Sequence, residues 1–143
     1  AALQGWKKLI DGYFKTNLAL NKLAKASSFR GNSVDYNASM VTDGDKETYW
    51  ATNDEEKTGN LVIDLGAPKL ISFVTIQEYI KLGQRVKSFS VEIARDGKWV
   101  AVAKGTTIGY KRILKIFPTE AQNIRIVISD SKACPVISNV EVY

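Results

Sequence analysis

The stretch NIRIVIS, residues 123–129, alternates apolar and polar side chains and decides the fold class. In a strand, Ile124, Ile126 and Ile128 would lie on one face and the residues between them on the other. SFSVEI, residues 88–93, has the same period of two. This alternation predicts half-buried strands of an antiparallel sheet with one face against the core.

Six further segments of the chain have strand character and are separated by turn signals such as GAP and RDGK. They are residues 24–28, 60–65, 70–79, 98–103, 112–117 and 138–143. About eight strands and no second helical pattern predict an all-β fold, a two-layer β-sandwich of jelly-roll type. We expect this sandwich to occupy residues 17–143.

The first sixteen residues, AALQGWKKLIDGYFKT, have a different period. Their apolar side chains recur at intervals of three and four and are Leu3, Trp6, Leu9, Ile10, Tyr13 and Phe14. This spacing is typical of an amphipathic helix. We therefore expect one short N-terminal helix over residues 1–16, joined to the sandwich at Asn17.

The composition of the 143 residues fits one domain with a sizeable core and narrows the possible chemistry. The chain has no histidine and a single cysteine, Cys134, which excludes Ser-His-Asp and Cys-His catalysis and a zinc-thiolate cluster. The basic residues behind the net charge of +5 are scattered, so no nucleic-acid partner is expected. The absence of a long apolar run and the polar loops predict neither an anchor, nor a signal peptide, nor a membrane partner.

The segment MVTDGDKETYW, residues 40–50, is the first candidate site. Asp43, Gly44 and Asp45 have the composition of a tight turn. With Thr48 they could also supply carboxylate, hydroxyl and carbonyl oxygens to a hard cation such as Ca²⁺, provided that a remote carboxylate helps. A solvated turn that caps a short helix and a metal site both remain open from this spacing, while Trp50 is expected in the core.

The same two carboxylates raise the possibility of glycoside hydrolysis. A pair of catalytic carboxyl groups needs one acid whose pKa is raised by apolar surroundings. A polar glycine turn around Asp43 and Asp45 offers no such surroundings. The sequence therefore predicts that this chain is not itself an enzyme.

Four segments together resemble a known family. They are NLALNKLAKASS (17–28), YNASMVTDGDKETYWAT (36–52), LVIDLGAPKLIS (61–72) and ISNVEVY (137–143). They are similar to discoidin domains, also called coagulation factor V/VIII type C domains, and in particular to carbohydrate-binding modules of family 32. IQEYIKLGQRVKSFSVE (76–92) and GTTIGYKRI (105–113) further resemble the C-terminal sandwich of bacterial and plant α-L-fucosidases of glycoside hydrolase family 29.

The resemblance implies a structural calcium site. In many such modules one Ca²⁺ lies under the binding loops, held by loop oxygens and by a glutamate of the last strand with the carbonyl before it. The positions that match are the carbonyls of Met40 and Val140 and the side chains of Asp43, Asp45, Thr48 and Glu141. The parity of the last strand agrees, because it leaves Glu141 on the face opposite its apolar neighbours.

The resemblance also implies a glycan as partner, bound by loops at one end of the sandwich. Loop residues that could reach that end are Asn53, Asp54, Glu78, Tyr79, Arg85, Tyr110 and Arg112. Of these, the predicted ligand-binding residues are Asn53, Glu78, Arg85, Tyr110 and Arg112. Glu78 and Arg85 could form an ordinary exposed ion pair, or they could present an acceptor and a donor to a sugar. Both interpretations stay open here.

The function implied by the resemblance is a non-catalytic C-terminal accessory domain of an α-L-fucosidase, with carbohydrate binding. The catalytic (β/α)8 barrel of the parent enzyme would be its second partner, and the predicted helix would be the joint to that barrel. A stand-alone lectin-like module is the alternative. The resemblance further implies a secreted or periplasmic location.

Overall fold

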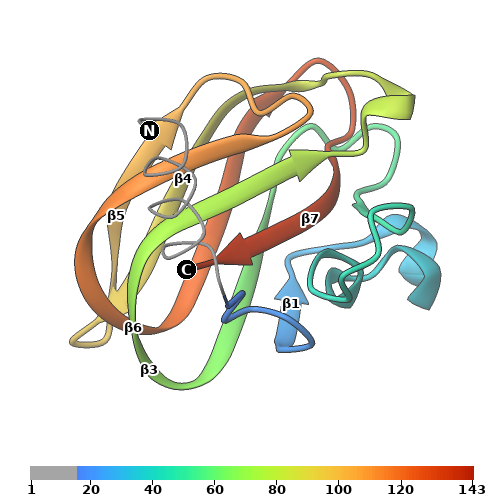
Figure 1. Cartoon of the computed structure of the whole chain (residues 1–143). Coiled ribbons are helices and arrows are strands. Elements are labelled where there is room, and N and C mark those ends of the chain that lie inside the picture. Colours follow the sequence, from blue (N-terminus) through green and yellow to red (C-terminus); the bar gives the residue numbers. More distant parts are fainter. Residues whose placement is uncertain (1–15) are drawn as a thin grey trace, which may run out of the picture.

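The computed structural model describes residues 16–143 (Figure 1). The helix predicted for residues 1–16 lies outside the described residues, apart from Thr16. The described part contains seven strands and four single-turn 3-10 helices. In chain order they are β1 (Leu23–Ala26), η1 (Arg30–Asn32), η2 (Val34–Tyr36), η3 (Ala38–Val41), β2 (Trp50–Ala51), β3 (Gly59–Glu78), η4 (Ile80–Leu82), β4 (Val86–Arg95), β5 (Lys98–Gly105), β6 (Arg112–Ser131) and β7 (Val136–Val142).

Two long strands, β3 and β6, each belong to both layers of the sandwich. The second half of β3 pairs with β7 and with the first half of β6, and β2 extends this layer beyond β7. The first half of β3 pairs with β1 and with the second half of β6, which β4 and then β5 extend. Figure 1 shows β3 and β6 as long, curved ribbons that join the two layers. The predicted all-β jelly-roll sandwich is confirmed.

The turn signal GAP marks a bend inside β3 rather than a loop between two strands. Gly66 has φ of 87°, a value that favours glycine, and its N–H donates to the carboxylate of Asp64 at 2.8 Å. The pairing with β6 shifts register between Asp64 and Lys69. The predicted segments 60–65 and 70–79 are thus one strand, as are 112–117 and 123–129, and the two-residue β2 was not predicted.

The core follows the alternation seen in the sequence. Ile124, Ile126 and Ile128 of β6 are buried, and so are the matching apolar residues of β4. Trp50 is fully buried, and its indole N–H donates to the carbonyl of Ser28 at 2.9 Å. The prediction that Trp50 belongs to the core is confirmed. Among the helices within residues 16–143, none is long and apolar enough to cross a membrane.

The beginning of the described chain is fixed to the end of the last strand. The N–H of Leu18 donates to the carbonyl of Val142 at 2.7 Å, and the N–H of Val142 donates to the side chain of Asn17 at 3.0 Å. At the opposite end of β7, the end of β3 is surrounded by residues 79–85, which include η4, and by the loops 106–111 and 132–135. The candidate sites lie on these loops and on residues 40–48.

Candidate functional site

The loop 40–48 is folded tightly by its own carboxylates. The N–H of Asp45 donates to Asp43 and the N–H of Glu47 donates to Asp45, both at 2.9 Å. Gly44 between them has φ of 77°, and a Cβ there would lie 3.0 Å from the side chain of Leu20. A glycine is therefore required at this turn both for its backbone conformation and for the space that it leaves.

Three oxygens of this loop converge on the hydroxyl of Thr48. Its Oγ1 lies 2.5 Å from Asp43 Oδ2, 2.9 Å from the Asp45 carbonyl and 3.4 Å from the Met40 carbonyl. One hydroxyl proton can serve only one of these acceptors, so acceptors outnumber donors in the cluster. An all-oxygen set of carboxylate, carbonyl and hydroxyl groups is the kind that Ca²⁺ prefers. The donor chemistry of the loop therefore fits this cation.

Asp45 faces this oxygen cluster with its carbonyl, while its carboxylate holds the N–H of Glu47. Within residues 16–143, no three His, Cys, Asp or Glu side chains gather closely enough to hold a metal ion. A cation at the loop would therefore depend on main-chain carbonyls and on Thr48 as much as on carboxylates.

Glu141 is engaged away from the loop. Its carboxylate accepts hydrogen bonds from Thr75 and Tyr143, both at 3.0 Å, and pairs with Lys111 at 3.4 Å. Burial disfavours the charged form, but these hydrogen bonds and the lysine outweigh it and lower the pKa of Glu141. Burial, together with the carboxylate, raises the pKa of Tyr143 to about 12. The Glu141 contacts described here all lie outside residues 40–48.

The outward parity predicted for Glu141 is confirmed, since Val140 and Val142 on either side of it are fully buried. Val140 lies opposite Ile76 in the pairing of β7 with β3. The structure thus brings together three loop groups of the predicted metal set, which are the Met40 carbonyl, the Asp43 carboxylate and the Thr48 hydroxyl. The carboxylates of Asp45 and Glu141, which the set also included, have other partners.

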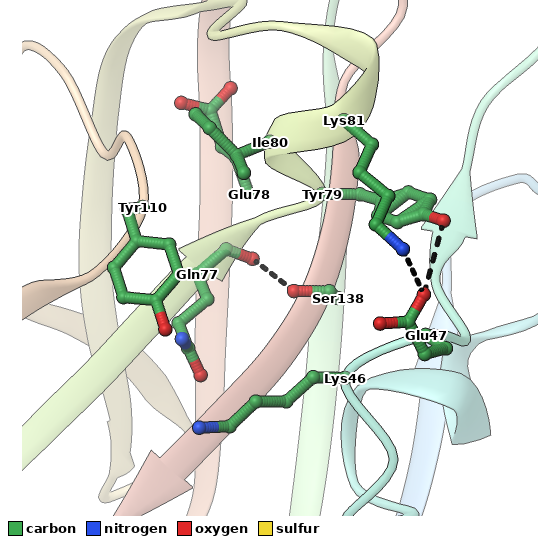
Figure 2. Close-up of a pocket in the computed structure, with 9 residues that line it drawn as sticks. All are labelled: Lys46, Glu47, Gln77, Glu78, Tyr79, Ile80, Lys81, Tyr110 and Ser138. Atoms are coloured by element: carbon green, nitrogen blue, oxygen red, sulfur yellow. Dashed lines mark hydrogen bonds and ion pairs between the residues drawn. The ribbon is translucent and has the colours of Figure 1, made fainter.

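A groove of about 170 Å³ lies beside this loop (Figure 2). It is lined by Lys46, Glu47, Gln77, Glu78, Tyr79, Ile80, Lys81, Tyr110 and Ser138. Tyr110 stands at one side with 66% of its surface exposed, and Tyr79 stands at the other. The volume is smaller than the roughly 300–1,000 Å³ of pockets that enclose a whole small molecule. The groove can therefore hold part of an extended polar ligand.

The wall around Tyr79 is rigid because its ring is stacked and its neighbours are paired. Tyr79 stacks on Tyr49 with ring centroids 4.5 Å apart, and Tyr36 contacts Tyr49 at 5.5 Å. Burial, together with Tyr36, raises the pKa of Tyr49. The ammonium of Lys81 lies 2.7 Å from the carboxylate of Glu47, and this hydrogen bond raises the pKa of Lys81. These contacts hold the aromatic and charged groups of one wall in place.

The Glu78 carboxylate lies under the groove and is only 3% exposed. It accepts three main-chain hydrogen bonds, from Arg85 at 2.8 Å, Val86 at 2.9 Å and Gly109 at 2.7 Å. It therefore joins two loops through their backbone. The Arg85 guanidinium points elsewhere, to the carbonyl and Sγ of Cys134. Glu78 and Arg85 thus meet through the Arg85 backbone N–H rather than through the suggested pair of side chains.

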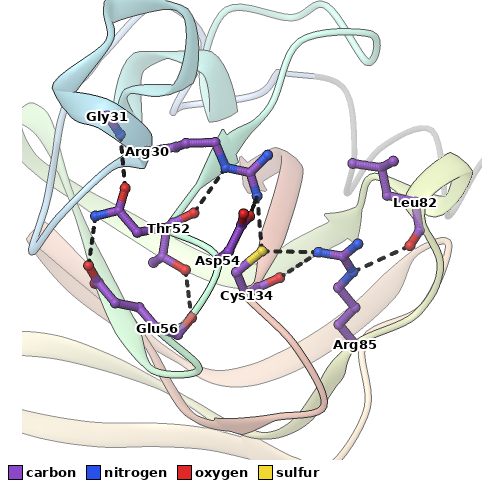
Figure 3. A network of polar contacts seen from close by, with 9 residues as sticks. Arg30, Gly31, Thr52, Asp54, Glu56, Leu82, Arg85 and Cys134 are labelled. Carbon is purple, nitrogen blue, oxygen red and sulfur yellow. Dashed lines mark hydrogen bonds and ion pairs between the residues drawn. The ribbon is translucent and has the colours of Figure 1, made fainter.

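A second network ties the neighbouring loops together around Cys134 (Figure 3). Arg30 donates to Cys134 Sγ at 3.0 Å and pairs with Asp54 at 3.2 Å, and Arg85 reaches the same sulfur at 3.1 Å. Asn53 accepts from the N–H of Gly31 and donates to Glu56, both at 2.9 Å. The side chains of Arg85 and Asn53 are therefore used in holding loops to one another.

Arg112 donates to the carbonyl of Thr107 and so braces the loop that carries Tyr110. Of the five predicted ligand-binding residues, Tyr110 has its side chain exposed at the groove and Glu78 lies beneath it. The sequence reasoning did not select Lys46, Lys81 or Ser138. The sequence offers one signal for the two lysines, which is their position. Lys46 lies in the loop 40–48, and Lys81 lies two residues after Tyr79.

Comparison with known proteins gives a family match over most of the chain. Residues 23–142 match the F5/8 type C domain. Alpha-L-fucosidase 1 of Arabidopsis thaliana is 31% identical over 147 residues, which cover 99% of this chain and 29% of the plant protein. The chain thus spans less than a third of the length of that relative.

Two solved structures show the same fold. A GH29 fucosidase of Ruminococcus gnavus, in complex with fucose, superposes with a TM-score of 0.85 at 38% identity, over 94% of this chain and 28% of that one. Chitosan-binding module 2 of a Paenibacillus chitosanase/glucanase, in complex with chitotriose, superposes with a TM-score of 0.79 at 24% identity, over 89% of this chain and 99% of the module. From its fold and from the family match, the chain belongs to the F5/8 type C, or discoidin, domain family.

Proposed function

We propose that this chain is a non-catalytic accessory domain of an α-L-fucosidase and that it binds carbohydrate in the groove between Tyr79 and Tyr110. The similarity to fucosidases supports the first part, since it covers almost all of this chain but less than a third of each enzyme. A fold shared with a module solved in complex with chitotriose supports the second. The catalytic part of the enzyme would then lie in the remaining two thirds.

The observation that carries the carbohydrate proposal is the exposed ring of Tyr110 beside convergent polar side chains. A tyrosine ring offers an apolar face to a sugar ring and a hydroxyl to its oxygens. Lys46 lines the same groove within reach of such a ligand (Figure 2). Ser138 also lines it, with its hydroxyl donating to the carbonyl of Gln77 at 3.3 Å. A few polar groups beside an aromatic platform are what recognition of a small polar ligand needs.

We further propose that Ca²⁺ binds at the loop 40–48, held by the carboxylate of Asp43, the hydroxyl of Thr48 and the carbonyls of Met40 and Asp45. Its support is the surplus of acceptors around the Thr48 hydroxyl. Lys46, which lines the groove, belongs to the same loop. When bound, the cation would fix the loop conformation on which that side of the groove depends.

The carbohydrate proposal is tested by a glycan array on the 1–143 chain, followed by titration of a glycan that binds. Tyr110→Ala should weaken that binding about tenfold, because it removes the aromatic platform. The control is Ile113→Ala, an exposed apolar side chain outside the groove, which should leave the affinity unchanged. Equal affinities for the two variants would place the sugar elsewhere, and an array without binding would leave only the accessory role.

A further inference from the structure

An apolar groove lies on one side of the sandwich, between the free edges of its two layers. The strand order ends at β5, which makes β5 the edge of one layer. The first half of β6 pairs with β3 alone and forms the edge of the other. The groove between them has a volume of about 380 Å³ and is lined by Arg95, Val100, Ala101, Val102, Ile116, Phe117, Pro118 and Thr119.

Phe117 projects from this edge on a bulge. Thr119 pairs with Ile71 and Lys115 pairs with Phe73, so three residues of β6 lie opposite one residue of β3. Ile116 points into the core, whereas the ring of Phe117 is 90% exposed within the described residues. An exposed phenylalanine beside Val100 and Val102 makes a contiguous apolar patch, which usually marks a contact surface.

The described chain begins close to this patch. Asn17 is bound to Val142, and the carbonyl of the next residue, Tyr143, accepts the N–H of Phe73 at 2.9 Å. Phe73 in turn pairs with Lys115, next to the bulge. Three strand spacings of about 4.8 Å separate Asn17 from the bulge, or about 15 Å. Residues 1–15 would span about 22 Å even as a helix, so they are long enough to reach the groove.

We propose that residues 1–15 pack the apolar side of their sequence into this groove. The sequence that precedes Thr16 has an apolar side of its own, with Trp6, Ile10 and Tyr13 at helical spacing. A short amphipathic segment needs an apolar partner to be stable in water, and the groove offers an exposed apolar surface within its reach. This groove shares no lining residue with the groove proposed to bind carbohydrate.

The first test is a double-mutant cycle on the 1–143 chain, read by melting temperature. Trp6→Ser and Phe117→Ser should each lower the melting temperature by about 5 °C, because each removes a buried aromatic ring. The double variant should melt little below either single one, because the two rings share one contact. The controls are Lys7→Ser, on the polar side of the segment, and Val34→Ser, an apolar side chain that is 71% exposed; both should shift melting by about 2 °C or less. Additive losses, or no loss from Phe117→Ser, would overturn the proposal.

The second test maps the contact directly. A photo-crosslinking amino acid at position 117 should label residues 1–15 of the same chain, at a yield that does not depend on protein concentration. Labelling of another copy, with a yield that rises with concentration, would assign the groove to a dimer and overturn the proposal. Absence of any crosslink within the chain would also overturn it.

Discussion

Two carboxylates near the same end of the sandwich, Glu78 and Asp43, have opposite balances of donors and acceptors. Glu78 is buried, and its two oxygens accept three main-chain N–H groups from two loops. Asp43 accepts one N–H and then shares the single hydroxyl of Thr48 with two carbonyls. The first carboxylate is satisfied by the protein alone, and the second belongs to a cluster with acceptors to spare.

This difference separates a structural carboxylate from a candidate ligand site. Within residues 16–143, every buried side-chain nitrogen and oxygen has a hydrogen-bond partner, so burial does not reveal a missing ligand. An excess of acceptors over donors is the better indicator, because a bound cation can satisfy several oxygens at once. Glu78 and Asp43 should therefore respond in opposite ways to mutation and to chelation.

The largest expected effect comes from Glu78→Gln. The NH2 of the glutamine amide is a donor, so it would face at least one main-chain N–H that now donates to the carboxylate. That buried N–H would be left without an acceptor. Loss of such charge-assisted hydrogen bonds should lower the free energy of unfolding by about 3 kcal/mol. Urea denaturation measures the change.

Glu120→Gln is the matched control, because Glu120 is exposed on β6, and it should change stability by less than about 0.5 kcal/mol. Similar small losses for the two variants would mean that Glu78 does not hold the loops. The contrast between Glu78 and Asp43 would then disappear.

The next largest effect is the loss of stability when calcium is removed from the loop 40–48. Binding to the folded state alone stabilises it by about 2.7 kcal/mol when free calcium is a hundredfold above its dissociation constant. EDTA should therefore lower the melting temperature of a calcium-loaded preparation by several degrees. Asp43→Ala should abolish this response, because it removes the only carboxylate oxygen that contacts the Thr48 hydroxyl in the cluster.

Asp54→Ala is the control for calcium, since Asp54 pairs with Arg30 outside the oxygen cluster. This variant should keep the full response to EDTA. If chelation leaves the melting temperature of a preparation with verified calcium content unchanged, the loop is a self-supporting turn. If Asp43→Ala and Asp54→Ala lose the response equally, the cation binds elsewhere.

The fold could be predicted because alternation of apolar side chains reports which face of a strand is buried. The same signal could not show that 60–65 and 70–79 form one strand, because Gly66 bends the chain without ending its pairing with β6. It also missed β2, because two residues are too few to show a period. The pattern thus identifies faces better than it identifies strand ends.

The oxygen cluster of the loop was predictable in part because its members are neighbours in sequence, and calcium binding there stays a prediction. Met40, Asp43, Asp45 and Thr48 are brought together by turns within nine residues. The partners of Glu78 lie on loops seven and thirty-one residues away, and they are backbone groups that no side-chain pattern reveals. Glu141 is oriented by Thr75 of another strand and by Lys111 of a loop, which the sequence does not place beside it.

The smallest expected effect concerns the contact between Tyr143 and Glu141. The folded-state pKa of Tyr143, about 12, exceeds the value near 10 of an exposed tyrosine. The unfolded chain therefore ionises first as the pH rises, so the contribution of Tyr143 is complete below pH 10 and is lost as the pH rises through 12. For Glu141, whose pKa is lowered, the contribution is instead lost as the pH falls through its folded-state pKa.

Tyr143→Phe isolates the alkaline part of this behaviour. The variant should melt below the wild type at pH 8, and the two melting temperatures should converge between pH 10 and 12, because only the wild type loses the Tyr143 contribution there. Tyr110→Phe, which removes the hydroxyl of an exposed tyrosine, should follow the wild-type curve in circular-dichroism melts over the same pH range. Parallel curves for Tyr143→Phe and the wild type would show that the hydroxyl of Tyr143 is not held by Glu141. Glu141 would then have a carboxylate less constrained by its own strand, and the remote calcium ligand implied by the family resemblance would regain support.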